Sequence, residues 1–523
     1  MITYILFTLF LLSRALASGD LAVRASTGIY AGQLNSNFSS VREFLNVPYG
    51  LSTSGSRRWL PPKKVPSSSK HYDSTKFPPS CSQYVSRIKS VYNQVVPEYQ
   101  IYDGSENTTA GLFAETTSED CLSLGVWTPA DATSASSLPV ALFMTGGGFV
   151  TGGVQIPYQL PQRWVSRTQG HVVVTINYRL NIMGFPNAAG LDNQNLGLLD
   201  QRLALEWVRD NIRYFGGDPS AITLWGQSAG SASTDFQNYA FYHDPIARAF
   251  FMQSGTVVNR TNNLDYDHTN FTFVAKKLGC NFPEDGESEL KCMRKVPVSL
   301  IENFVGQYQD NTTLVTPHQP AIAFTPIADE KVVFANVSQR YAEGKVSKAP
   351  ALMSTCADEG ASLSPYPGTP GNSFTGVNQT AANIITFGTV CGAAWSSTLR
   401  HAAGLVSYRY QYAGNWSNVS PLPWMGPYHA SDLPMIFGAY DVARGGGTEL
   451  ERETSATMED YLLAFLKDPY DGPKKMGWIP FDPTASNGGT ILRFGADGKT
   501  VQNATGHEVQ DWCYGNGTYD FSP

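Results

Sequence analysis

The segment Ile222-Thr-Leu-Trp-Gly-Gln-Ser-Ala-Gly230 is the strongest indication of the fold class. Its first four residues form a short apolar run typical of a buried strand, and a helix-like stretch, Ser231 to Tyr242, follows the last glycine. The turn between them fits the pattern GxSxG, in which small residues on both sides of a serine let its Oγ project from the end of a strand. This context favours a nucleophilic role for Ser228 over an ordinary glycine-rich helix start.

Strands and helices alternate upstream of this segment. The β-branched runs Val140 to Met144 and Val172 to Ile176 predict two strands separated by a glycine-rich turn and a helix-length stretch. Apolar residues from Leu198 to Ile212 then form one helical stripe, which Phe215-Gly-Gly-Asp-Pro219 ends. This order predicts an α/β fold with a mostly parallel sheet flanked by helices, where ligands bind beyond the carboxyl ends of the strands.

Three consecutive glycines, Gly146 to Gly148, follow the first of these strands. Glycines let the main chain approach a substrate closely and turn its N–H groups toward a developing oxyanion. A tight turn without a chemical role is the alternative interpretation. We predict that the backbone amides of Gly147, Gly148 and Ala229 form the donor set.

The composition places the chain among globular proteins. Of its 523 residues, 42% are hydrophobic and 15% are charged, which does not fit a disordered, collagen-like or coiled-coil chain. A formal net charge of -7 offers no cationic face to phosphate backbones, so we expect no nucleic-acid partner. The cysteine and histidine spacings match no zinc-site pattern, and we predict neither a metal nor a cofactor.

The N-terminus has the pattern of an export signal. An apolar stretch, Ile5 to Leu12, precedes the small-residue motif Ala15-Leu16-Ala17, so residues 1–17 are predicted to be a signal peptide cleaved after Ala17. No later segment has eighteen consecutive apolar residues, so we expect no integral membrane segment and an exported, extracellular protein. Without an internal repeat or low-complexity linker, residues 18–523 are predicted to form a single domain.

Two further features fit the secretory pathway. An oxidising compartment favours disulfides, although seven cysteines cannot all pair within one chain. N-glycosylation motifs occur eleven times, at Asn37, Asn107, Asn259, Asn270, Asn311, Asn336, Asn378, Asn415, Asn418, Asn503 and Asn516.

Four further sequence segments carry recognisable patterns. They are Phe44-Leu-Asn-Val-Pro-Tyr-Gly50, Glu119-Asp-Cys-Leu-Ser-Leu124, Asn177-Tyr-Arg179 and the block from Gly197 to Gly230. With them the chain resembles the type-B carboxylesterase/lipase family of α/β-hydrolases, and its fungal secreted branch in particular. The resemblance implies an α/β-hydrolase fold and hydrolysis of carboxylic esters through an acyl-enzyme.

The resemblance also implies the catalytic order Ser…Glu…His. Glu359 in Asp358-Glu359-Gly360 matches the family's acid, with the adjacent Asp358 as its rival. Three of the eight histidines follow this acid, His401, His429 and His507. His429 matches the family's histidine loop, where it would take the proton of Ser228 while Glu359 fixes the imidazole tautomer.

The same resemblance implies three disulfides, Cys81–Cys121, Cys280–Cys292 and Cys391–Cys513, and a free Cys356. The loop closed by the first pair carries the lid in related lipases. Choline-binding relatives have a Trp in this loop and Glu before the nucleophile. Here the loop lacks Trp and Gln227 precedes Ser228, so a cationic ester is disfavoured.

We therefore expect a secreted serine carboxylesterase for neutral, fairly apolar small-molecule esters. Interfacial lipase action on long-chain acylglycerols, an esterase dedicated to a fungal secondary-metabolite pathway, and a non-catalytic binding role are the alternatives.

Overall fold

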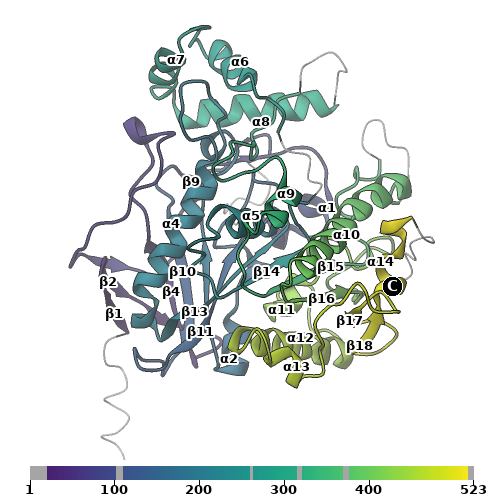
Figure 1. The fold of residues 1–523 in the computed structure, drawn as a ribbon. Helices are drawn as coiled ribbons and strands as arrows, with labels where there is room; N and C mark the ends of the chain where they lie inside the picture. Colours follow the sequence, from purple (N-terminus) through teal and green to yellow (C-terminus); the bar gives the residue numbers. More distant parts are fainter. Residues whose placement is uncertain (1–20, 102–109, 259–262, 315–320, 369–375, 516–523) are drawn as a thin grey trace, which may run out of the picture.

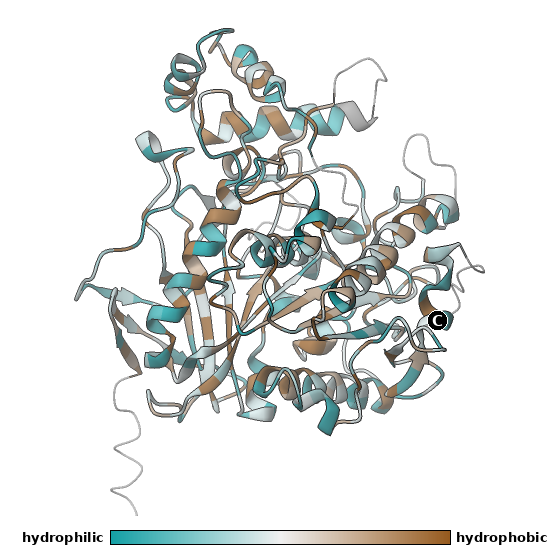
Figure 2. Cartoon of the chain, viewed as in Figure 1, coloured by the Kyte–Doolittle hydropathy of each residue, from teal (hydrophilic) through white to brown (hydrophobic). Residues whose placement is uncertain are grey.

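The computed structural model describes residues 21–101, 110–258, 263–314, 321–368 and 376–515. The predicted signal peptide, residues 1–17, lies outside these ranges, as do Asn107, Asn259 and Asn516. Within them, Figure 1 shows a central sheet with helices packed around it. Figure 2 shows hydrophobic residues concentrated along the central strands, while the surrounding helices alternate between hydrophobic and hydrophilic residues.

The central sheet of the described chain has eleven strands in the order β18-β17-β16-β15-β14-β13-β11-β12-β10-β4-β3. The neighbours from β12 to β17 run parallel, whereas β3, β4, β10 and β18 pair antiparallel at the two edges. The predicted α/β class with a mostly parallel sheet is therefore confirmed. The strand bounds are β3 Gln33–Leu34, β4 Val41–Pro48, β10 Ser123–Pro129, β11 Leu138–Met144, β12 Val172–Ile176, β13 Gly217–Gln227, β14 Ala249–Gln253, β15 Ala351–Cys356, β16 Ser407–Tyr412, β17 Thr490–Phe494 and β18 Val501–Thr505.

Strands β11 to β15 are buried on both faces because their apolar side chains alternate between two cores. In β11, Ala141 and Phe143 belong to one hydrophobic cluster, and Val140 and Leu142 belong to the other. Helix α12 (Glu449–Lys467) contributes to the first cluster and helix α4 (Leu196–Asn211) to the second. Such two-sided burial explains why these strands appear in the sequence as continuous apolar runs.

Further helices and small strands complete the described chain. The remaining helices are α1 Val91–Gln94, α2 Gln162–Thr168, α3 Asn181–Gly184, α5 Ala229–Ala240, α6 Thr269–Lys277, α7 Gly286–Met293, α8 Val298–Leu314, α9 Val337–Ala342, α10 Gln379–Ala402, α11 Leu433–Ile436, α13 Gly472–Lys475 and α14 Gly506–Gln510. The small strands are β1 Ala22–Ala25, β2 Gly28–Ala31, β5 His71–Asp73, β6 Ser80–Cys81, β7 Tyr84–Val85, β8 Leu112–Phe113 and β9 Thr117–Ser118. No helix of the described ranges is both long and apolar enough to cross a membrane.

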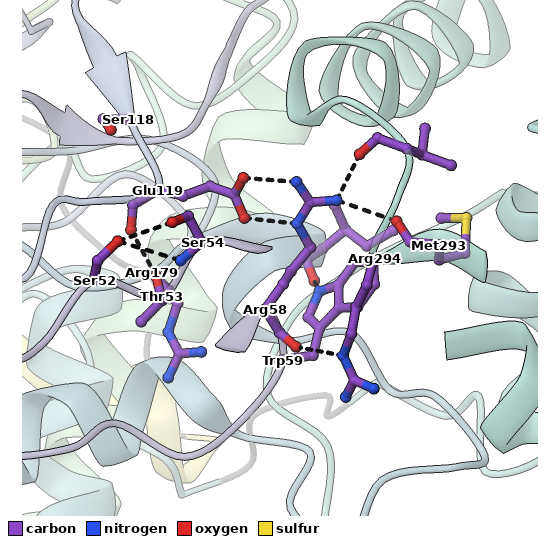
Figure 3. Close-up of polar contacts among 12 residues, drawn as sticks. Ser52, Thr53, Ser54, Arg58, Trp59, Ser118, Glu119, Arg179, Met293 and Arg294 are labelled. Atoms are coloured by element: carbon purple, nitrogen blue, oxygen red, sulfur yellow. Dashed lines mark hydrogen bonds and ion pairs between the residues drawn. The ribbon is translucent and has the colours of Figure 1, made fainter. Parts of the chain in front are cut away.

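Helices α6 to α8 form a helical segment at the top of Figure 1, and one hydrophobic cluster joins them to Trp59, to α3 and to the start of α4. Arg58 ties this segment to the chain near Cys121. Its guanidinium donates to both carboxylate oxygens of Glu119 at 2.6 Å and also to the carbonyl oxygen of Met293 at 3.1 Å (Figure 3). Since both charged side chains are almost fully buried, this charge-assisted bidentate pair fixes the base of the 81–121 loop.

Candidate active site

Ser228 occupies the turn between β13 and α5, as the GxSxG pattern predicts. Its φ of 56° and ψ of -120° lie outside the regions that non-glycine residues normally adopt. The serine amide donates to the carbonyl oxygen of Gln253 on the neighbouring strand at 2.8 Å, which fixes the strained turn. A Cβ at Gly226 would lie 2.1 Å from the Gly230 carbonyl oxygen, so only glycine fits before the turn.

His429 and Glu359 form a buried pair near the same edge of the sheet. Glu359 follows β15, and His429 lies in the loop between β16 and α11. The imidazole Nδ1 is 2.5 Å from Glu359 Oε2, and the second carboxylate oxygen accepts the Cys356 amide at 2.8 Å. Glu359 is 0% exposed and His429 is 5% exposed. This contact assigns Nδ1 to the carboxylate and leaves Nε2 available for proton transfer.

Asp358 does not occupy the position beside the imidazole. Its amide donates to the Pro427 carbonyl oxygen at 3.0 Å, and its carboxyl oxygen packs so closely on Gly426 that a Cβ there would lie 2.1 Å away. Burial raises the pKa of Asp358 to about 7. The geometry therefore brings Glu359, rather than its neighbour, to His429.

The other two late histidines are on the surface. His401, in the last turn of α10, lies 3.5 Å from Asp482, and its side chain is 37% exposed. His507, in α14, pairs with Asp511 at 2.6 Å, and its side chain is 51% exposed. Neither histidine contacts Ser228 or Glu359 in the described ranges.

Gln227 contacts the imidazole on the side away from Glu359, a contact that no sequence motif predicts. Its Nε2 lies 3.1 Å from His429 Nε2, whereas no hydrogen bond joins Ser228 Oγ to the imidazole in the described part of the chain. Serine–histidine bonds often tighten only when a substrate is bound. The only sequence signal for this contact is that Gln227 immediately precedes the serine.

The glycine run lies directly beside the serine turn. Gly147 and Gly148 have φ values of 101° and 64°, and the Gly147 carbonyl oxygen accepts the amides of Val150 and Thr151. Within the described residues, the amides of Gly147, Gly148 and Ala229 donate to no protein acceptor. They are therefore free to bind the carbonyl oxygen of a substrate that approaches Ser228.

Disulfides close the three loops that the resemblance implies, Cys81–Cys121, Cys280–Cys292 and Cys391–Cys513. Cys356 is free and buried behind the Glu359 carboxylate, with its Sγ 3.9 Å from Ser431 Oγ. Burial raises the pKa of this thiol well above its ordinary value, so it remains protonated. The described residues hold no cluster of three or more His, Cys, Asp or Glu that could bind a metal ion.

These elements define an α/β-hydrolase, with a serine turn and a carboxyl–imidazole pair beyond the carboxyl ends of a parallel sheet. The chain belongs to the carboxylesterase family, whose model matches residues 19–385. That match includes Ser228 and Glu359 and ends before His429.

Three relatives are similar over most of their length. The chain is 38% identical to the chlorogenic acid esterase of Aspergillus niger, with 94% of each chain covered. It is 37% identical to secreted lipase 5 of Gibberella zeae, covering 96% of this chain and 95% of the relative. The acetylcholinesterase of Bungarus fasciatus is 26% identical, over 88% of this chain and 81% of its own. The chain is accordingly a carboxylic ester hydrolase.

Proposed function

We propose that the protein is a secreted serine carboxylesterase that hydrolyses neutral, fairly apolar carboxylic esters. Ser228 is the nucleophile, His429 the general base and Glu359 the acid that orients it. The observation that carries this proposal is the 2.5 Å contact between Nδ1 and Glu359 Oε2, on a histidine buried close to a strained, partly exposed serine. Glu359 and His429 come from different loops, 70 positions apart, and contact here only because the sheet brings the loops together.

The acylation half-reaction follows from this arrangement. Ser228 Oγ attacks the ester carbonyl carbon while its proton passes to His429 Nε2. The carbonyl oxygen becomes an oxyanion, which the amides of Gly147, Gly148 and Ala229 bind. The imidazolium, stabilised by the Glu359 carboxylate, then protonates the departing alcohol, leaving an acyl-serine.

Deacylation uses the same groups with water as the nucleophile. His429 accepts a proton from water as the hydroxyl attacks the acyl carbon, and the same three amides bind the second oxyanion. The imidazolium returns its proton to Ser228 Oγ as the carboxylic acid leaves. The two half-reactions together add one water across the ester bond.

The preference for neutral esters rests on Gln227. This side chain is 3% exposed and contacts the imidazole, and it carries no charge at the position where choline-binding relatives have Glu. A quaternary ammonium ester would therefore find no anionic partner at this position.

The 81–121 loop favours an esterase over a lipase with a mobile lid. Asp310 of α8 accepts three hydrogen bonds from this loop, from Tyr84 Oη at 2.8 Å, Ser86 Oγ at 2.6 Å and the Arg87 amide at 3.0 Å. Asn303 of the same helix accepts the Phe113 amide at 2.6 Å. Opening these segments at an interface would leave a nearly buried carboxylate without its donors.

Export is supported by the three disulfides and by relatives that include a secreted lipase. For glycosylation we propose the four motif asparagines that are exposed within the described ranges, Asn37, Asn336, Asn415 and Asn503. Asn418 is excluded because it is buried and its Nδ2 donates to the Tyr440 carbonyl oxygen at 3.0 Å.

The test is hydrolysis of p-nitrophenyl esters from acetyl to palmitoyl by the exported protein, with Ser228→Ala as the matched control. We expect turnover of short and medium esters by the wild type, none by the folded variant, and fluorophosphonate labelling of the wild type alone. Turnover by Ser228→Ala would refute the proposal. A rate that jumps when the substrate forms micelles would support the lipase instead.

A further inference from the structure

One stretch of the 81–121 loop contacts the loop that contains His429. The Tyr92 hydroxyl lies 2.7 Å from the His429 carbonyl oxygen and 2.8 Å from Ser362 Oγ. The first contact requires the tyrosine to donate, so Ser362 donates to the tyrosine. Ser362 lies three residues after Glu359. A single hydroxyl therefore joins the loop of the proposed base to the loop of the proposed acid.

A second tyrosine of this stretch binds the next residue. The Tyr99 hydroxyl donates to the Ala430 carbonyl oxygen at 2.9 Å. Ala430 has a φ of 76°, a left-handed conformation that non-glycine residues rarely adopt. The hydrogen bond to its carbonyl oxygen helps to stabilise this conformation. The conformation sets the direction of the backbone directly after His429.

The rings of these tyrosines form a packed cluster with two others. The ring of Tyr99 lies 4.9 Å from Tyr158 and 6.1 Å from Tyr428, both edge-on. Tyr428 immediately precedes His429, and its hydroxyl donates to that of Tyr99 at 3.2 Å. Burial raises the pKa values of the Tyr92 and Tyr99 hydroxyls, so both remain protonated donors.

Arg444 also binds the stretch from Tyr92 to Tyr99. Its guanidinium donates to the Val95 carbonyl oxygen at 2.6 Å, to Glu98 Oε2 at 2.8 Å and to the Tyr158 hydroxyl at 2.9 Å. Both side chains of the ion pair are partly buried, with 25% and 19% of their surface exposed. The stretch from Tyr92 to Tyr99 is thus bound to the histidine loop and to the chain beyond it.

We infer that Tyr92 and Tyr99 are positioning residues for His429, and that this part of the expected lid serves as a fixed clamp on the base. The inference rests on the proposed function. Neither hydroxyl faces the reacting atoms, so each acts through the backbone on which the imidazole is mounted. Because a displacement of about 1 Å can cost on the order of 100-fold in rate, small movements of this backbone matter.

The principal variant is Tyr92→Phe, which keeps the ring and removes both hydrogen bonds. We expect kcat to fall about tenfold with KM unchanged, because the Tyr92 hydroxyl binds the His429 carbonyl oxygen and Ser362 and so acts on the backbone that carries the base. The rate of fluorophosphonate labelling at Ser228 should fall by the same factor. Tyr99→Phe should act in the same direction.

Tyr84→Phe is the matched control, because it removes a hydroxyl of the same loop that binds Asp310 of α8 instead of the histidine loop. It should leave kcat and the labelling rate unchanged. Equal losses in Tyr84→Phe and Tyr92→Phe would show a general effect of loop anchoring and would overturn the clamp.

Ser362→Ala keeps Tyr92 and removes only its contact with the acid loop. We expect kcat of Ser362→Ala to fall below that of the wild type, but by less than in Tyr92→Phe. The comparison of Ser362→Ala with the wild type can still be made if Tyr92→Phe does not fold. Wild-type kcat in folded Tyr92→Phe, or in Ser362→Ala where the former does not fold, would overturn the inference. If Ser228→Ala is inactive in the same assay, the proposed function survives that failure.

Discussion

Replacing Glu359 by Gln tests the acid of the proposed triad with almost no change of shape. The carboxylate oxygen that accepts the Cys356 amide can be replaced by the amide oxygen of Gln. The new NH₂ group would then face His429 Nδ1 across the 2.5 Å contact and could only donate. Nδ1 would have to lose its proton to Nε2, which could then no longer accept the proton of Ser228. This wrong tautomer costs on the order of 10⁴ in kcat, or about 5 kcal/mol of barrier.

The assay compares initial rates on p-nitrophenyl butyrate and thermal melting for Glu359→Gln and Asp358→Asn. The second variant makes the same change from carboxyl to amide one residue away. In the wild type, the carboxyl of Asp358 packs on Gly426 rather than on the imidazole. We expect kcat within about twofold of wild type for Asp358→Asn, as for a residue outside the reacting groups. Loss of activity in Asp358→Asn with activity kept in Glu359→Gln would refute the assignment.

Asp358→Asn should also change how the free energy of unfolding depends on pH. Burial raises the pKa of this carboxyl from 3.8 to about 7, so the folded protein keeps a proton that the unfolded chain has already lost. Stability therefore falls as the pH rises from about 4 to about 7. The Asn variant should show a shallower decline in the free energy of unfolding over this window.

Two further variants test the packing of the site and of the helical segment. Gly146→Ala places a Cβ 2.6 Å from Gln227 Oε1, 2.9 Å from the Gln227 carbonyl oxygen and 3.0 Å from Ser228 Cβ, so kcat should fall on the order of 100-fold and the melting temperature should fall as well; an unchanged rate would contradict this. Glu302 of α8 is 0% exposed and burial raises its pKa to about 8, so stability should fall as the pH rises from about 4.5 to 8. Glu302→Gln should remove at most about 5 kcal/mol of that decline, measured by urea unfolding at pH 5 and pH 9; equal declines in both proteins would contradict it.

The sequence predicts the centre of the fold because local signals agree there. The run Val172 to Ile176 is found as β12 with the same bounds, and Val140 to Met144 lies within β11. The stripe from Leu198 to Ile212 is found as α4, displaced by two residues or fewer. The expected strand Ile222 to Trp225 is longer, because β13 continues along its parallel neighbours from Gly217 to Gln227. Antiparallel edges such as β4 were not predicted, since pairing direction depends on residues distant in the chain.

The sequence predicts only those residues of the site that belong to recognisable motifs. GxSxG, the glycine run and the family's acid and histidine loops point to the proposed reactive groups. The contacts that orient them have no local pattern, because a tyrosine hydroxyl or a glutamine amide can bind many partners. Tyr92 and His429 are 337 positions apart, and Gln227 and His429 are 202 apart. Such pairs follow from the sheet order, which the motifs do not specify.

Strained backbone conformations occur both at the proposed nucleophile and next to the proposed base. Ser228 and Ala430 both have positive φ values, 56° and 76°, and each lies at or beside a proposed reacting group. Such conformations persist only where the surroundings hold them. Gln253 of β14 accepts the Ser228 amide, and Tyr99 of the 81–121 loop donates to the Ala430 carbonyl. Since these supports come from separate parts of the fold, loosening the loop should disturb the base while leaving the nucleophile turn intact. Slower labelling at a normally folded Ser228 is the outcome that distinguishes a misplaced base from a damaged nucleophile.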